Sequence, residues 1–221
     1  MLAAGGRGTR AAGNSSSAPL KQFRDLHGRP LLQWSLDALF AAGTDRAVVV
    51  VPKDLHRDAR DLFADDRVEV VDGGPSRQNS VWNGLRLVES QVVVVHDGAR
   101  PLVTPQMIEM AVGSLGDADG AVPVVPVDET LKQVKEDEVV KTIDRAKLRR
   151  VQTPQVFVTE VLKEAHTKAR ADRFEATDDA QLVERYGGRI KVFEGDRANV
   201  KVTYEEDLAV VEAILAARGT T

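Results

Sequence analysis

The sequence contains no cysteine among its 221 residues. This absence excludes disulfides, cysteine metal sites and a thiol nucleophile, and it fits a reducing compartment. No apolar run approaches the roughly 18 residues that a membrane-spanning helix needs. No signal peptide precedes the glycine-rich start of the chain, so we expect a cytoplasmic enzyme.

Several motifs of known chemistry are also missing. No His-x-x-x-His pair or carboxylate triad suggests a zinc or iron site. The glycine spacing fits neither a P-loop nor a dinucleotide-binding fingerprint. The net charge of −4 argues against a general nucleic-acid binder. The remaining composition, 43% hydrophobic and 29% charged, is ordinary for a soluble globular protein.

The chain opens with a glycine-rich stretch, Met1-Leu-Ala-Ala-Gly-Gly-Arg-Gly-Thr-Arg10. Its glycines let the backbone adopt positive φ and come close to a ligand. A run of turned backbone N–H groups forms a concavity that binds anions. Arg10 and Lys21 add two positive charges, which suit phosphate oxygens. We therefore predict a nucleoside triphosphate site, although such glycines alone also fit a flexible chain end.

Strands and helices alternate along most of the chain. The strand expected at 46–51 begins with Arg46 and continues as an apolar run rich in valine, which is typical of strands buried on both faces. The pattern predicts an α/β protein with a mostly parallel sheet. The first strand is expected to be very short or truncated, because only Met1 and Leu2 precede Ala3. Strands are expected at 46–51, 67–71, 91–95, 121–125 and 189–193, and helices at 30–42, 53–63, 78–88, 105–115, 159–170, 177–186 and 204–218.

Residues 127–151 interrupt this alternation. The segment is charged and rich in β-formers, which predicts a hairpin that leaves the main body. Two interpretations remain open from the pattern, a solvated loop and a dimerisation arm. We see no linker elsewhere, so residues 1–221 are expected to form a single domain that carries this arm.

Two polar clusters follow expected strands, at the sheet edge where ligands bind in such folds. Gly74, Arg77 and Ser80 lie at the start of a helix, where unpaired N–H groups bind anions. Ser80 could instead be the helix cap. Asp97 follows a buried strand and is placed to hold a metal-bound triphosphate, since Mg²⁺ typically takes one or two carboxylates with phosphates. Arg100 could grip a substrate phosphate, whereas the plain alternative for Asp97 is a loop cap.

Later motifs are weaker when taken singly. Arg145, in Thr-Ile-Asp-Arg, could be an exposed charge of the arm. Thr153 lies in a Thr-Pro-Gln turn that is common. Thr177, before Asp-Asp-Ala, is a plausible helix cap. Lys201, on or beside a strand, could reach the triphosphate or simply be a surface lysine.

The order of the clusters is more specific than any one of them, and it resembles the 2-C-methyl-D-erythritol 4-phosphate cytidylyltransferase family over essentially the whole chain. The resemblance implies a Rossmann-like nucleotidyltransferase fold with helices on both faces of the sheet, and a homodimer joined through the arm. It implies transfer of CMP from CTP to methylerythritol phosphate in the non-mevalonate isoprenoid pathway, with Mg²⁺ or another divalent cation. Departures are a longer first loop, Gly98 in place of a common alanine, and Glu129 in place of an aspartate.

The resemblance also implies roles for individual residues, each carried over by its motif. It assigns catalysis to Arg10, Lys21 and Lys201. It assigns nucleotide binding to Ala4, Gly5, Gly6, Gly8, Gly74, Arg77, Ser80 and Asp97, with Asp97 near the metal. It assigns methylerythritol phosphate binding to Arg100, Thr130, Arg145, Thr153 and Thr177, with Arg145 reaching the partner subunit's substrate.

Two rival functions share these features. A ribitol 5-phosphate cytidylyltransferase would keep the CTP half of the site and differ in the polyol pocket. A non-catalytic regulatory module would bind CTP without releasing pyrophosphate. The charged residues at positions 10, 21, 97 and 201 argue against the regulatory module.

Overall fold

The structure is a computed structural model that describes residues 1–5 and 23–219. The predicted roles of Gly6, Gly8, Arg10 and Lys21 fall outside these residues, so they stay predictions.

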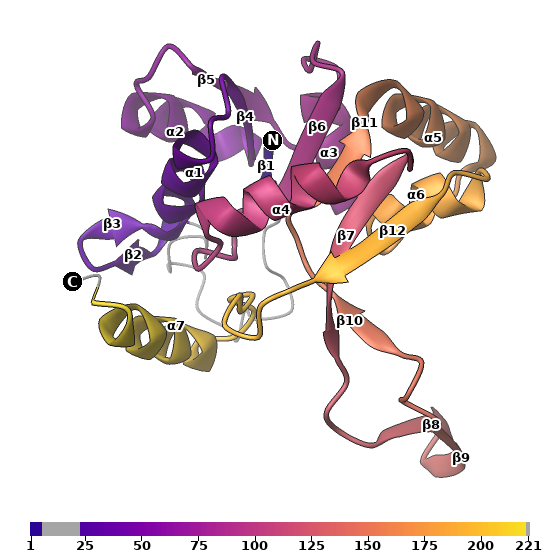
Figure 1. Cartoon of the computed structure of the whole chain (residues 1–221). Helices are drawn as coiled ribbons and strands as arrows, with labels where there is room; N and C mark the ends of the chain where they lie inside the picture. The colour runs from indigo at the N-terminus through magenta and orange to yellow at the C-terminus, as the bar shows by residue number, and fades with distance from the viewer. Residues whose placement is uncertain (6–22, 220–221) are drawn as a thin grey trace.

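A central mixed sheet organises the protein (Figure 1). The strand order is β12-β7-β11-β6-β1-β4-β5. β11 pairs with the amino-terminal end of β7, and β10 pairs with its carboxyl-terminal end on the same side. Among the strands of residues 1–5 and 23–219, only β10 and β11 run antiparallel to their neighbours within this sheet. The mostly parallel α/β fold is thus confirmed. The strands are β1 (Leu2–Ala3), β4 (Ala47–Val51), β5 (Val68–Asp72), β6 (Val92–Asp97), β7 (Gly120–Pro126), β10 (Arg149–Val151), β11 (Gln155–Val158) and β12 (Ile190–Glu194).

Helices cover both faces of the sheet because alternate strand residues point to opposite sides. In β4, Val48 and Val50 pack into one apolar cluster, and Val49 and Val51 into another. The first cluster includes residues of α3 (Arg77–Leu85), α5 (Thr159–Asp172) and α6 (Asp179–Arg185). The second includes residues of α1 (Leu31–Ala41), α2 (His56–Leu62) and α4 (Pro105–Leu115).

Small elements complete the chain. The helix expected at 53–63 is divided into a 3-10 turn, η2 (Lys53–Leu55), and α2. The short hairpin of β2 (Asp25–Leu26) and β3 (Arg29–Pro30) was not expected, and neither was β11. The terminal helix α7 (Glu206–Ala217) packs Val211 and Leu215 against Leu26 and Leu102.

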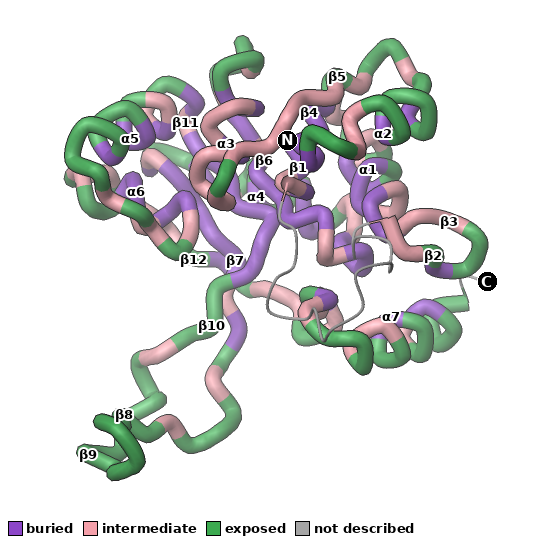
Figure 2. Tube along the Cα trace, turned by 180° about the vertical axis from the view of Figure 1, so that it is seen from behind, coloured by how far each residue is buried: buried purple, intermediate pink, exposed green. Residues whose placement is uncertain are grey.

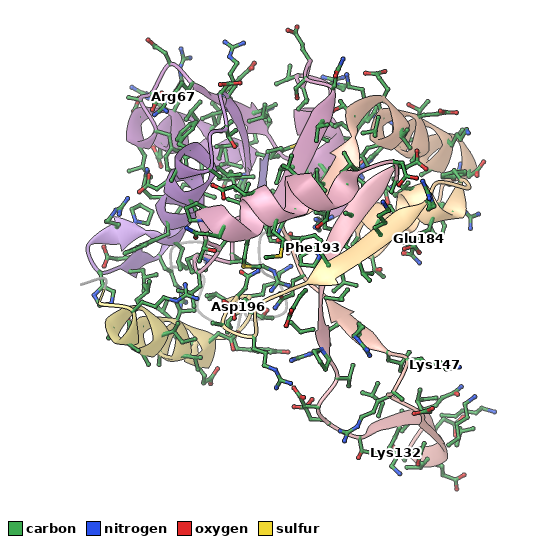
Figure 3. All side chains as sticks on the ribbon, in the orientation of Figure 1. Arg67, Lys132, Lys147, Glu184, Phe193 and Asp196 are labelled. Atoms are coloured by element: carbon green, nitrogen blue, oxygen red, sulfur yellow. The ribbon has the colours of Figure 1, made fainter. Side chains whose placement is uncertain are left out.

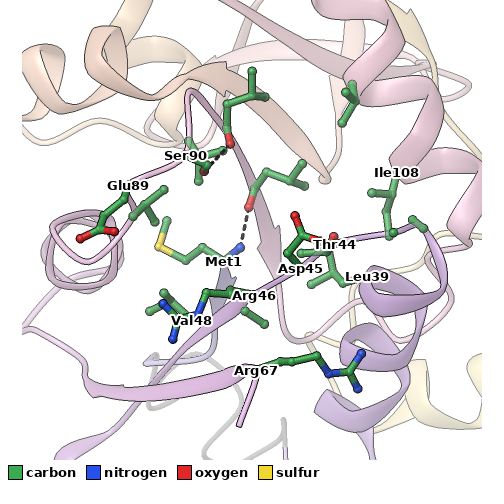
Figure 4. A pocket seen from close by; sticks show the side chains of 18 of the residues that line it. Met1, Leu39, Thr44, Asp45, Arg46, Val48, Arg67, Glu89, Ser90 and Ile108 are labelled. Atoms are coloured by element: carbon green, nitrogen blue, oxygen red, sulfur yellow. Dashed lines mark hydrogen bonds between the residues drawn. The ribbon is translucent and has the colours of Figure 1, made fainter. Parts of the chain in front are cut away.

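The first strand is present but has only two residues. Leu2 pairs with Val49 of β4 and with His96 of β6. The Met1 amine donates to the Val94 carbonyl at 2.7 Å, where the ladder stops. Beyond Met1, a pocket of about 770 Å³ opens between the amino ends of β4 and β6 (Figure 4).

The segment expected to be a hairpin leaves the body as an arm. Here β8 (Leu131–Lys135) pairs antiparallel with β9 (Glu138–Ile143). Figure 2 shows the arm as almost wholly exposed, in contrast to the buried strands of the sheet. Lys132 and Lys147 lie on it, clear of the sheet (Figure 3). The protruding hairpin is confirmed, and its role is a separate question.

Within the described ranges, we find no helix with the length and apolar character needed to cross a membrane.

Candidate active site

The carboxyl ends of β1 and β5 meet the start of α3 with no space for extra side-chain atoms. A Cβ built on Gly5 would lie 2.6 Å from the Ser80 hydroxyl, and one on Gly74 would lie 2.5 Å from the Asn79 Cβ. The Gly74 N–H donates to the Ser80 Oγ at 3.0 Å. Glycine is therefore required at positions 5 and 74 for backbone segments far apart in the sequence to come together.

The cap of α3 is Ser76, whose Oγ accepts the Asn79 N–H. The interpretation of Ser80 as the cap is therefore wrong. Ser80 lies one turn further into the helix, is buried, and donates to the Ser76 carbonyl at 2.9 Å. Ser76 precedes the apolar part of the helix in the sequence, so a capping pattern counted from residue 76 could have identified it.

Asp97, at the end of β6, lies at the centre of a cluster of positive charges. Its Oδ1 accepts from the Arg77 Nε at 3.2 Å, and its Oδ2 accepts from the Lys201 Nζ at 2.6 Å. The Arg100 Nε lies 3.8 Å from Oδ2. Burial by itself raises the pKa of Asp97, but the three cations outweigh burial and hold the pKa well below its usual range. Asp97 is therefore a stable carboxylate and not a proton donor.

Thr153 and His96 hold Asp97 in place from the buried side. The Asp97 N–H donates to the Thr153 Oγ1 at 3.0 Å, and Oγ1 lies 3.0 Å from the His96 Nδ1. The His96 Nε2 faces the Arg100 carbonyl at 3.1 Å, which can only accept, so Nε2 carries the hydrogen. Burial lowers the pKa of His96 to about 4. The imidazole is therefore neutral at pH 7, and the Thr153 hydroxyl donates to its Nδ1.

Arg100 and Lys201 are held by the segment that follows β12. The Arg100 Nη1 donates to the Asn199 carbonyl at 2.8 Å, and the Val202 N–H donates to the Ala99 carbonyl at 2.8 Å. Lys201 therefore lies in a loop beside the end of β6 and not on a strand. Its side chain is 43% exposed, whereas that of Asp97 is 10% exposed, so the ammonium faces the solvent side of the cluster.

Asp179 joins this site through Arg77, although the sequence did not single it out. The Arg77 Nη1 donates to the Asp179 Oδ2 at 2.8 Å. Asp179 is the first residue of α6 and is buried. Its neighbour Asp178 caps α6 by accepting the Gln181 N–H, so the interpretation of Thr177 as the cap is wrong. The only signal in the sequence was the pair of adjacent aspartates at a helix start.

The structure brings some of the predicted site residues together and leaves others apart. Ala4, Gly5, Gly74, Arg77, Ser80, Asp97, Arg100, Thr153 and Lys201 lie around the carboxyl ends of β1, β5 and β6. Thr177 is exposed just before α6. Thr130 and Arg145 are exposed in the arm segment, and no contact in the described part of the chain links them to Asp97.

Metal binding rests on few donors here. Among residues 1–5 and 23–219, no three histidine, aspartate or glutamate side chains gather in a way that could hold a metal ion. Asp97 offers a carboxylate, but both of its oxygens face cations. Within the described ranges, Asp97 could therefore give at most one carboxylate to a metal ion whose other ligands came from elsewhere.

The charges decide what the cluster can bind. Three cations, Arg77, Arg100 and Lys201, face two carboxylates, Asp97 and Asp179. The excess of positive charge at the carboxyl end of a parallel sheet suits a phosphorylated ligand. The large pocket beyond Met1 lies at the amino ends of the strands and is not part of this site.

Comparisons with known proteins agree on one family. The family model described as IspD, 2-C-methyl-D-erythritol 4-phosphate cytidylyltransferase, matches residues 1–217. The protein of that description from Aquifex aeolicus is 40% identical over 215 residues, which is 97% of this chain and 96% of the relative. The one from Rubrobacter xylanophilus is 41% identical over 226 residues, covering 99% and 94% respectively.

Solved structures give the same answer. The crystal structure of 2-C-methyl-D-erythritol 4-phosphate cytidylyltransferase from Thermus thermophilus superposes with a TM-score of 0.78 at 33% identity, covering 90% of this chain and 95% of that one. The 4-diphosphocytidyl-2C-methyl-D-erythritol synthase structure from Anaerococcus prevotii gives a TM-score of 0.82 at 27% identity, with the same coverage.

Proposed function

The chain belongs to the 2-C-methyl-D-erythritol 4-phosphate cytidylyltransferase family, and from this premise we propose how its candidate site performs the family's reaction. The enzyme transfers CMP from CTP to 2-C-methyl-D-erythritol 4-phosphate in the non-mevalonate isoprenoid pathway. The products are 4-diphosphocytidyl-2-C-methyl-D-erythritol and pyrophosphate. The observation that carries the proposal is the cluster of Arg77, Arg100 and Lys201 around the buried carboxylate of Asp97.

The reaction depends on positive charge around the phosphates and requires no general base. A phosphate oxygen of methylerythritol phosphate attacks the α-phosphorus of CTP in line, a P–O bond forms, and the bond to pyrophosphate breaks. A phosphate monoester has its second pKa near about 6, so the nucleophile is largely dianionic at neutral pH. No proton has to be removed, and catalysis is positioning together with stabilisation of charge.

Lys201 is the catalytic cation of the described site. Its ammonium lies at the open side of the cluster, where it can leave Asp97 for a phosphate oxygen. Arg10 and Lys21, assigned by their motif, would act with it on the triphosphate. Mg²⁺ would be held by Asp97 and the phosphates, and when bound it supplies positive charge against the phosphate oxygens.

Nucleotide binding is assigned to the close-packed junction of Ala4, Gly5, Gly74, Arg77 and Ser80. Gly5 and Gly74 let the ends of β1 and β5 pack directly on α3, which supports a closely packed backbone surface for the nucleotide. Arg77 extends from α3 to Asp97 and is 30% exposed, so one side of its guanidinium remains accessible.

Methylerythritol phosphate binding is assigned to Arg100, Thr153 and Thr177 on the body and to Thr130 and Arg145 on the arm. The two groups of residues lie apart within one chain, which supports an arm that completes the site of a second copy. Exposed valines on the arm, at positions 134, 139 and 140, support its role as the dimer contact.

Pyrophosphate release tests this proposal. We expect release with CTP, Mg²⁺ and methylerythritol 4-phosphate, and little release with ribitol 5-phosphate. Turnover mainly with ribitol 5-phosphate would agree with the proposed CTP site but would show that the acceptor substrate is ribitol 5-phosphate. CTP binding without release from either acceptor would favour the regulatory module and contradict the proposal.

A further inference from the structure

A buried chain of charged and aromatic side chains lies behind the nucleotide site. The Asp179 side chain is 1% exposed, and that of His166 on α5 is not exposed at all. The His166 Nε2 donates to the Asp179 Oδ1 at 3.3 Å, and the His166 ring stacks on Trp82 of α3 with centroids 5.9 Å apart. The other carboxylate oxygen, Oδ2, accepts from the Arg77 Nη1 at 2.8 Å.

The Arg77 guanidinium contacts two carboxylates through different nitrogens. Nη1 is fixed by the buried Asp179, while Nε reaches Asp97 at 3.2 Å. A guanidinium is planar and rigid, so fixing one nitrogen sets the direction of the others. Asp179 therefore sets the orientation of the Arg77 guanidinium toward Asp97. Because Lys201 is bound at the other oxygen of Asp97, this orientation also affects the position of the Lys201 ammonium.

The charges of the two carboxylates agree with this arrangement. Burial raises the pKa of Asp179, but Arg77 and the His166 contact outweigh it, and the pKa is lowered. An ionised, buried carboxylate costs free energy unless it is paired. Asp179 is paired through both oxygens, on α5 and α3, while its backbone belongs to α6. Asp179 thereby links α5 and α6 to Arg77 on α3.

We propose that Asp179 is a positioning residue for CMP transfer, which orients Arg77 and through it the Asp97–Lys201 pair. The inference rests on the proposed function for its catalytic consequence. The Asp179 side chain is 1% exposed and reaches the site only through Arg77, so its role is to position that arginine and not to bind a substrate. The linked residues, in order, are His166, Asp179, Arg77, Asp97 and Lys201.

The test replaces Asp179 with asparagine, which keeps the shape and an acceptor oxygen but removes the charge. We expect kcat to fall about 10- to 100-fold, the loss seen when the partners that orient metal-ligating side chains are removed, because Asp179 orients Arg77 in a comparable way. The KM for CTP should stay near that of the unchanged enzyme or decrease, because the cluster becomes more positive. A loss of packing alone would instead lower the melting temperature and leave kcat per folded molecule unchanged, which would overturn the proposal.

Asp178→Asn is the matched control. It makes the same chemical change one residue away, and asparagine caps a helix as well as aspartate does. We expect its kcat to stay close to that of the unchanged enzyme. A second check uses the Arg77→Gln background, where Asp179→Asn should cause little further loss. Losses that multiply in the double variant would contradict action through Arg77.

A readout independent of turnover separates this inference from the proposed function. The Arg77 Nε–H resonance, assigned by its absence in Arg77→Gln, should be sharp in the unchanged protein and broadened in Asp179→Asn. Equal sharpness in both would overturn the positioning role. If this resonance behaves as expected but no pyrophosphate is released, the proposed function fails and the positioning of Arg77 stands.

Discussion

Lys201 Nζ lies 2.6 Å from Asp97 Oδ2, across 104 residues of sequence. The pair joins the loop after β12, which carries the most exposed cation of the cluster, to the buried carboxylate at the end of β6. The carboxylate thus neutralises the ammonium. A triphosphate, with more negative charge than one carboxylate, can compete for it.

Lys201→Gln should lower kcat by a factor on the order of 10²–10³, because a preorganised donor to the developing phosphate charge is lost. The KM for each substrate should change much less. Initial rates of pyrophosphate release, with each substrate varied in turn while the other is saturating, measure kcat and both KM values. Lys163→Gln, which removes a lysine paired with Glu160 on α5, is the control and should match the unchanged enzyme. A Lys201 variant with only a raised KM would refute its catalytic role.

Thr153→Val should destabilise the protein by about 1–3 kcal/mol, since valine leaves the Asp97 N–H and the His96 Nδ1 without their buried partner. Thr153→Ser keeps the hydroxyl and should lose much less. Urea unfolding of both variants measures the difference. Equal stability of the valine and serine variants would mean that the hydroxyl does not hold Asp97 and His96 in place.

Protonation of His96 should make stability depend on pH. Burial lowers its folded pKa to about 4 from 6.5, so the unfolded chain binds the proton more readily between these values. This contribution to the free energy of unfolding is complete above pH 6.5 and falls by about 3 kcal/mol as the pH drops to 4. Urea unfolding across this range measures the slope. His96→Gln should flatten it, whereas the exposed His27→Asn should not.

The paired variant Val134→Asp with Val140→Asp should shift the proposed dimer to monomer. It places charge on exposed apolar positions of both arm strands, and buried unpaired carboxylates at a contact are unfavourable. Sedimentation velocity measures the shift, and Lys135→Gln on the same hairpin is the control. A dimer that persists unchanged in the paired variant would exclude the arm as the contact.

The pattern of apolar residues predicted most of the fold because the signals were local. The run Ala47–Val51 is apolar throughout, and β4 is indeed buried on both faces. The strand β11 was missed because Gln155–Val158 is short and takes its strand character from its partners β6 and β7. Thr153, just before it, therefore looked like part of an ordinary turn.

The site was predictable in part for the same physical reason. Residues just after strands are placed by topology alone, so the sequence could locate Asp97 at this edge of the sheet, while its role stays a prediction. Contacts between distant helices have no local signal, so the pairing of Asp179 with Arg77 and His166 was not predictable. Capping also depends on where the first turn begins, which is why Ser76 and Asp178 replaced the expected caps.

The first strand has only two residues, so the middle of the sheet is held by fewer hydrogen bonds than the strand pairs on either side. In the described part of the chain, β4–β5 and the strands from β6 outward are joined in the sheet through Leu2 and Ala3, with further backbone hydrogen bonds from Met1 and Ala4. Amide hydrogen exchange is normally slowest at the centre of such a sheet, where opening requires global unfolding. Here the halves can separate by losing a few hydrogen bonds, so β4 and β5 should exchange together as one unit, ahead of β6, β7 and β11.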